Sequence, residues 1–208
     1  MGKEMKVKLT FVDELLGTAS ADPEVHREYI ASRAPEAPGR AKKITEEIEA
    51  IGLEDTQEKH ITVFPRDKKG NPIVWDYQVR GFFKNAAKAL SYMGGDFKLP
   101  AYKTKIDLLV FVNERQIPIN MNGEIGDCQR PLRASTMQGD RVALANSESI
   151  PAGSSIEFTI HVNESGLTKH VENWLDFGRR NGLGQWRNSG KGSFTWEKLE
   201  DWHEVKGF

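Results

Sequence analysis

Two Gly-x-Gly pairs mark the stretch Gly182-Leu183-Gly184-Gln185-Trp186-Arg187-Asn188-Ser189-Gly190-Lys191-Gly192-Ser193-Phe194, with a polar, cationic run between them. Glycine turns the backbone through positive φ and lets another group approach the main chain closely. Together with Arg187, Lys191 and free backbone N–H groups, such a loop suits anionic oxygens. A loop that only needs flexible turns has the same composition. The place of the stretch in the chain has to decide between these interpretations.

The segments on either side of this stretch have the patterns of a helix and a strand. Apolar residues recur at i, i+4, i+7 and i+8 from Leu167, which predicts a helix over 167–180. The loop is followed by a short predicted strand at Ser193–Trp196, and the helix is preceded by Ser155–Asn163. That last segment alternates apolar and polar residues, which is typical of a half-buried strand.

The first half of the chain supplies three more elements. A strand is predicted at 6–12, an amphipathic helix at 78–93 and a strongly apolar strand at 105–113. The resulting order, βαββαβ, predicts an α+β fold with a ferredoxin-like (RRM-like) core. In this order the glycine-rich stretch joins the second helix to the fourth strand.

Residues 1–208 are predicted to form a single domain that carries insertions. Composition changes after the first strand, and the highly charged segment 20–58 predicts a mostly helical insertion. Segments 60–65 and 73–77 flank a turn and predict a hairpin. Residues 115–146 contain several glycines and prolines, which predicts an extended loop or an exposed hairpin.

Charge and cysteine content restrict the function classes. The formal net charge of −1 excludes bulk electrostatic attraction to nucleic acid, so any such binding needs a local patch. Cys128 is the only cysteine, which excludes an intramolecular disulfide and a cysteine-based zinc cluster. No apolar run approaches the length of a membrane span. We therefore expect a cytoplasmic protein without membrane contact.

The glycine-rich stretch, in its place before the fourth strand, resembles the loop of the RAMP superfamily, the repeat-associated RNA-binding proteins of CRISPR systems. Gly182, Gly184, Gly190 and Gly192 match that loop, while Ile150–Phe158 and Val79–Ala86 are similar to two further turns of the family. The resemblance implies a RAMP-like domain whose loop contacts an RNA backbone. It also implies guide-like single-stranded RNA as a partner, and assembly with copies of itself or with CRISPR-type proteins.

The predicted RNA-binding residues form one cationic segment without an acid. Phosphate contacts by such residues give affinity without sequence preference, and an indole can stack on an unpaired base. The alternative is that Trp186 belongs to the core and that the arginines complement the helix dipole. The predicted set is Arg179, Arg180, Gly182, Gly184, Gln185, Trp186, Arg187, Asn188, Ser189, Gly190, Lys191 and Gly192, with Arg130, Arg133 and Arg141 as additional contacts.

Spacing excludes nucleotide-binding motifs. A P-loop needs four residues between its first glycine and Gly-Lys-Ser/Thr, whereas five separate Gly184 from Gly190. Gly192 occupies the position of the hydroxyl residue, and Arg187 stands where a dinucleotide fingerprint has its third glycine.

Catalytic groups are not concentrated anywhere in the sequence. The five histidines are scattered without metal-ligand spacing, so we expect no catalytic residue, no metal and no cofactor. Two alternatives to RNA binding stay open. One is a phage-encoded anti-defence (anti-CRISPR) protein that acts through protein contacts. The other is a metal-independent endoribonuclease, with Asp13 or Asp22 as candidates.

Overall fold

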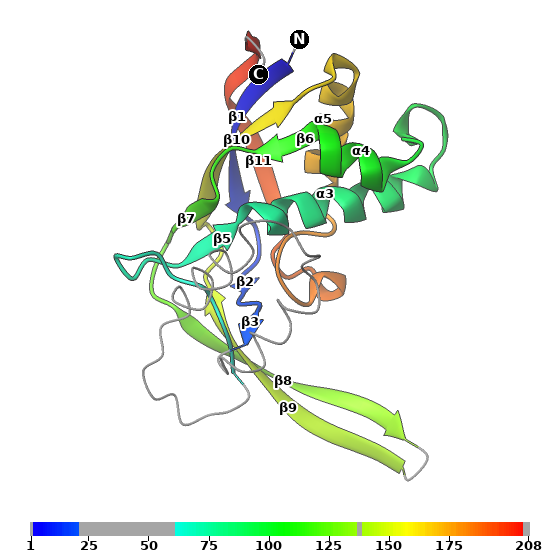
Figure 1. Cartoon of the computed structure of the whole chain (residues 1–208). Helices are drawn as coiled ribbons and strands as arrows, with labels where there is room; N and C mark the ends of the chain where they lie inside the picture. The colour runs from blue at the N-terminus through cyan, green and yellow to red at the C-terminus, as the bar shows by residue number, and fades with distance from the viewer. Residues whose placement is uncertain (1, 21–60, 137–138, 206–208) are drawn as a thin grey trace, which may run out of the picture.

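The computed structural model describes residues 2–20, 61–136 and 139–205. It confirms the α+β, ferredoxin-like fold (Figure 1). Four core strands lie in the order β11-β1-β10-β6, each antiparallel to its neighbour. Their bounds are β1 (Gly2–Phe11), β6 (Val110–Val112), β10 (Ser155–Val162) and β11 (Phe194–Val205). The same sheet is extended beyond β10 by β7 (Gln116–Asn120) and β5 (Ile73–Trp75).

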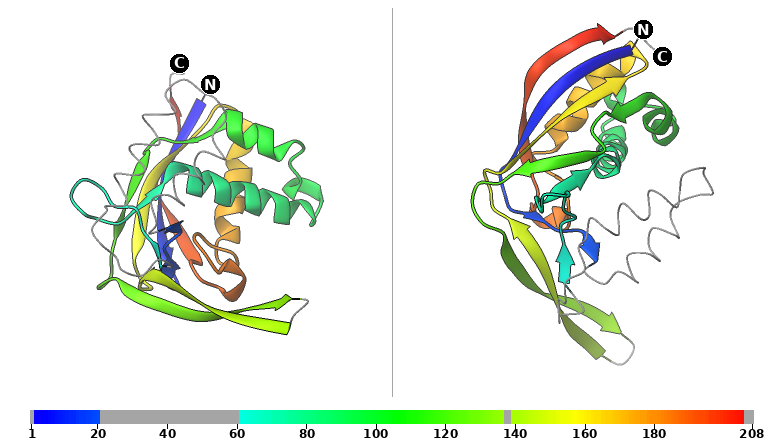
Figure 2. Two further views of the ribbon diagram at one scale, coloured as in Figure 1. Left: turned by 60° about the horizontal axis from the view of Figure 1, so that its bottom comes forward. Right: turned by 60° about the vertical axis from the view of Figure 1, so that its left-hand side comes forward.

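The helices lie on one side of this sheet (Figure 2). They are α3 (Asp76–Ser91), α4 (Tyr102–Leu109) and α5 (Thr168–Phe177). The apolar stripe of the predicted helix 78–93 is buried throughout, and β1 buries every second residue from Met5 to Phe11 against it. Short 3₁₀ turns complete the layer: η1 (Gly95–Phe97), η2 (Ser165–Leu167) and η3 (Arg187–Ser189). No helix in the described ranges is both long and apolar enough to cross a membrane.

Two predicted elements are wrong. Residues 105–113 are not one strand, because they divide between the end of α4 and the short β6. Ile106 is buried while Leu108 is 63% exposed, which is the one-sided pattern of a helix. The predicted hairpin of 60–65 and 73–77 also does not form: its halves join different sheets, and only an isolated bridge connects Arg66 with Pro72.

A second sheet lies next to the end of the first sheet where β1 leads into β2 (Figure 1). It has the order β2-β9-β4-β3, and β8 pairs with β9. The strands are β2 (Leu15–Leu16), β3 (Ala19–Ser20), β4 (Ile61–Val63), β8 (Gly126–Thr136) and β9 (Gly139–Ile150). The hairpin β8–β9 projects from the body of the molecule (Figure 1) and falls largely within residues 115–146. The insertion predicted at 20–58 lies almost wholly outside the described residues.

Candidate nucleic-acid interface

The glycine-rich loop leaves α5, passes the link between β1 and β2, and returns into β11. We call residues 182–183 and 191–193 the neck of this loop and residues 184–190 its tip. The neck is mostly buried and the tip is half-buried to exposed. The two parts are held by different interactions.

The neck closes through two glycines. A Cβ atom added to Gly182 would lie 1.7 Å from the carbonyl oxygen of Gly192, and one added to Gly192 would lie 1.9 Å from that of Leu183. Gly192 also has φ +67°, a conformation in which side chains are strained. The Leu183 N–H donates to the Gly192 carbonyl at 3.0 Å. The chain itself fills the space that these glycines leave, so we assign Gly182 and Gly192 the role of shaping the loop.

Lys191 fastens the neck to the β1–β2 link. Its ammonium group lies 2.6 Å from the Glu14 carboxylate and 3.1 Å from that of Asp13. The hydrogen bond to Glu14, followed by that to Asp13, raises the pKa of Lys191 above its ordinary value. The Gly192 N–H adds a hydrogen bond to the Glu14 carbonyl at 2.8 Å. The loop has no acid of its own, but two acids from the β1–β2 link lie against it. Lys191 forms ion pairs with both of them.

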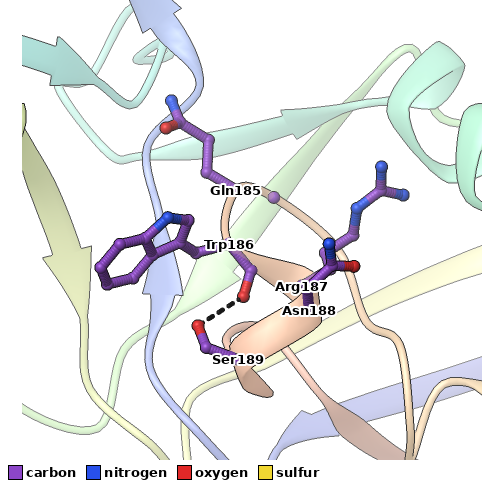
Figure 3. Close-up of a pocket in the computed structure, with 6 residues that line it drawn as sticks. Gln185, Trp186, Arg187, Asn188 and Ser189 are labelled. Carbon is purple, nitrogen blue, oxygen red and sulfur yellow. Dashed lines mark hydrogen bonds between the residues drawn. The ribbon is translucent and has the colours of Figure 1, made fainter. Parts of the chain in front are cut away.

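The tip forms the wall of a pocket of about 630 Å³. Among the described residues, its lining is the continuous run Gly184–Ser189 (Figure 3). The 3₁₀ turn η3 shapes this run, with Trp186 at φ 56° before it and Gly190 at φ 89° after it. The Ser189 hydroxyl donates to the Trp186 carbonyl at 2.9 Å. Trp186 is 38% exposed, so it does not belong to the core.

An arginine from β8 lies against the tip. The guanidinium of Arg130 lies 4.1 Å from the centre of the Trp186 ring, and its Nη2 donates to Gln185 Oε1 at 2.7 Å. Gln185 in turn donates to the Gly17 carbonyl at 2.8 Å. Arg130 is only 4% exposed, yet its Nε and Nη1 atoms have no hydrogen-bond partner among the described residues. The sequence predicted Arg130 as an additional contact but gave no sign of this stacking.

The remaining predicted cations are placed in two groups. Arg179 and Arg180 are exposed directly after α5, and Arg187 is half-buried in the tip. Within the described part of the chain, no carboxylate pairs with any of these three. Arg133 lies in β8, opposite Val142, and Arg141 lies in β9, opposite Ala134. The structure brings Arg130 to the loop and places positions 133 and 141 further along the hairpin.

The open face of the sheet differs from an RNA-binding RRM sheet. An RRM stacks bases on aromatic side chains of its central strands. The outward positions of the central strands β1 and β10 hold polar or charged residues: Glu4, Lys6, Lys8, Thr10, Glu157, Thr159 and His161. Trp186, which is exposed, contacts the Arg130 guanidinium and lines a pocket, lies in the loop and not on these two strands.

Two of the described histidines, His161 and His170, contact neighbouring side chains rather than a catalytic partner. His161 contacts Glu4 at 3.0 Å and Asn163 at 2.7 Å across the open face of the sheet. Burial lowers the pKa of His170, whose ring stacks on Trp174. In the described ranges, no group of three or more His, Cys, Asp or Glu side chains is arranged to hold a metal ion.

Comparison with known proteins supports the fold. No family model and no curated protein matches this sequence. The chain is similar to a chain of the cryo-EM structure of the Type III-B Cmr-beta bound to cognate target RNA, with a TM-score of 0.50 and 9% identity. The match covers 96% of this chain and 59% of that one, so this chain spans little more than half of its neighbour's length. At this identity the likeness shows a shared fold.

Proposed function

We propose that this chain binds single-stranded RNA without catalysis, mainly through the RNA backbone, and that its glycine-rich loop is the contact surface. The observation that carries the proposal is the loop tip between α5 and β11 of a ferredoxin-like fold. It combines a pocket, the exposed Trp186, and Arg187, which pairs with no carboxylate in the described part of the chain. Arginine and backbone N–H groups bind phosphates irrespective of sequence. The polar outer face of β1 and β10 supports the loop, rather than the sheet, as the binding surface.

The fold shared with a chain of the Type III-B Cmr-beta structure bound to cognate target RNA supports the RAMP-like assignment. As a RAMP-like subunit, the chain would bind guide-like RNA and assemble along it, with copies of itself or with CRISPR-type proteins. Size-exclusion chromatography with and without a long unstructured RNA tests this. We expect complexes that grow with RNA length; a single fixed complex on every length would contradict assembly.

Affinity measured against salt tests the binding itself. For single-stranded RNA, the slope of log K against log salt is roughly −0.7 for each neutralised phosphate. Fluorescence anisotropy with an unstructured RNA should show this slope, and the double variant Arg180→Ala/Arg187→Ala should flatten it by about 1.4. Lys103→Ala on α4, an exposed cation away from the loop, is the matched control and should leave the slope unchanged.

Other results would favour the alternatives. A protein without salt-dependent RNA affinity contradicts the proposal, and if it binds a CRISPR effector instead, it is an anti-defence protein. RNA that is shortened in the presence of EDTA, and remains intact with a histidine variant such as His161→Ala, indicates a metal-independent endoribonuclease.

A further inference from the structure

We infer that the pocket beside the loop tip holds one unstacked nucleobase of the bound RNA, so that binding has a base-dependent part in addition to backbone contacts. This inference rests on the proposed function and names what the same site recognises. It assigns the base to the exposed face of Trp186 and the adjoining phosphate to Arg187.

The lining of the pocket suits a nucleobase better than a phosphate alone. Its volume of about 630 Å³ lies within the range of small-ligand sites. A phosphate needs only cations and N–H donors, but the tip also supplies an indole, two amides and a hydroxyl: Trp186, Gln185, Asn188 and Ser189. The Gln185 amide is engaged by Arg130 and the Gly17 carbonyl, whereas the Asn188 amide offers a donor and an acceptor for the polar edge of a base.

The side chains divide between the two sides of the turn. Figure 3 shows Trp186 pointing to one side and Arg187 with Asn188 pointing to the other. A nucleotide has the same division, with a flat base at one end and an anionic phosphate at the other. The tip therefore presents a stacking surface and a cation at separate places, as one nucleotide requires.

The indole is held ready for stacking. Trp186 has φ 56°, in the left-handed region that non-glycine residues rarely adopt. Its ring is kept in place by the Arg130 guanidinium at 4.1 Å, which Gln185 holds at 2.7 Å. Gln185 is itself tied to the Gly17 carbonyl at 2.8 Å. Because three segments fix one ring, stacking a base on it orders little that is not already ordered.

Arg130 is a buried cation that supports the indole from below. It is a cation with 4% exposure, no carboxylate pairs with it in the described part of the chain, and Nε and Nη1 lack partners. Buried charges without a paired acid are costly and call for an explanation. The guanidinium occupies one face of the indole at 4.1 Å, so the other face is the one left for a base.

Abasic RNA separates the inference from the proposed function. The probe is a short oligouridine, compared with an abasic ribose-phosphate strand of the same length and charge. The intact strand should bind about tenfold more tightly, since one stacked base contributes roughly 1–3 kcal/mol. Trp186→Ala should remove this difference and leave the salt slope unchanged, whereas Trp186→Phe should retain most of it. Arg187→Ala should flatten the slope and keep the base preference.

Each failure has a distinct result. Equal affinity for both strands, with a slope that still depends on Arg187, overturns the nucleobase pocket and leaves backbone binding intact. No affinity for either strand overturns both. A base preference that persists in Trp186→Ala overturns the assignment to this pocket.

Discussion

The neck and the tip of the glycine-rich loop are adjacent in sequence and opposite in physical character. In the neck, Gly182 and Gly192 touch main chain and Lys191 is paired with two carboxylates. In the tip, Trp186 is 38% exposed and Arg187 has no acid partner in the described part of the chain. Glycines and cations therefore have different roles in the two parts of the loop. In the neck they stabilise the fold, and in the tip they are available to bind a ligand. Substitutions can test this division.

Gly192→Ala should have the largest effect. Its Cβ would lie 1.9 Å from the Leu183 carbonyl oxygen at a positive φ, so the neck must open, and we expect a loss of about 3 kcal/mol or more in unfolding free energy. Gly190→Ala is the matched control, because φ is +89° but the nearest described atom beyond its chain neighbours lies 3.9 Å from the added Cβ. It should cost about 1–2 kcal/mol. Urea denaturation of both variants gives the comparison; equal losses would mean that the neck does not depend on close approach.

Lys191→Met should destabilise the protein without changing how affinity depends on salt. The pairs with Glu14 and Asp13 are partly exposed, so about 1 kcal/mol at low salt is expected. Because the pKa of Lys191 is raised on folding, this stabilisation is complete below the ordinary lysine pKa and is lost as the pH rises through the raised value.

The pH dependence is measured as the difference in unfolding free energy between wild type and Lys191→Met. This difference should be constant from neutral pH to the lower edge of the lysine range and should shrink above that range. A flatter salt slope for RNA in this variant would place Lys191 on the ligand and blur the distinction between neck and tip.

Arg187→Ala should have the opposite effect to Lys191→Met: it should weaken RNA binding and leave the stability of the fold almost unchanged. The side chain makes no ion pair in the described part of the chain, so the unfolding free energy should change by less than about 0.5 kcal/mol. Affinity for RNA should fall and the salt slope should flatten by about 0.7. Anisotropy titrations together with thermal melts test both halves of this expectation. Marked destabilisation would show that the tip also supports the fold.

Ser189→Ala should have the smallest effect. It removes the hydroxyl donor to the Trp186 carbonyl, while the Ser189 N–H still donates to that oxygen at 2.9 Å. A few tenths of a kcal/mol in stability is expected, below the roughly 1 kcal/mol of a typical hydrogen bond. The readout is the preference for intact over abasic RNA, which should persist. Its loss would show that the hydroxyl sets the position of the indole.

Local patterns were sufficient for the core elements. The helical period from Val79 to Leu90 and the alternation in Ser155–Asn163 correspond to α3 and β10, because one-sided burial imposes these periods. The run 105–113 was misassigned because a short apolar segment has no clear period. Only the tertiary structure shows that Leu108 faces outward.

The site could be predicted only in part. Composition and position located the loop, but the partners that define its two halves come from distant parts of the chain. Arg130 meets Gln185 across 55 positions, and Lys191 meets Asp13 across 178. A sequence without structure shows a run of cations. It does not show which cation is neutralised and which lies beneath an indole.

The closed neck also has a consequence for how the loop can vary. Since Gly182 and Gly192 meet before the tip begins, we expect that the half-buried to exposed residues 186–189 of the tip can be exchanged without moving α5 or β11. The entropy of closing a flexible loop grows slowly, by about 0.6 kcal/mol for each doubling of its length. The neck therefore fixes the base of the loop, while the sequence of the tip can differ. We expect that other tip sequences placed between the same two glycines would bind other ligands.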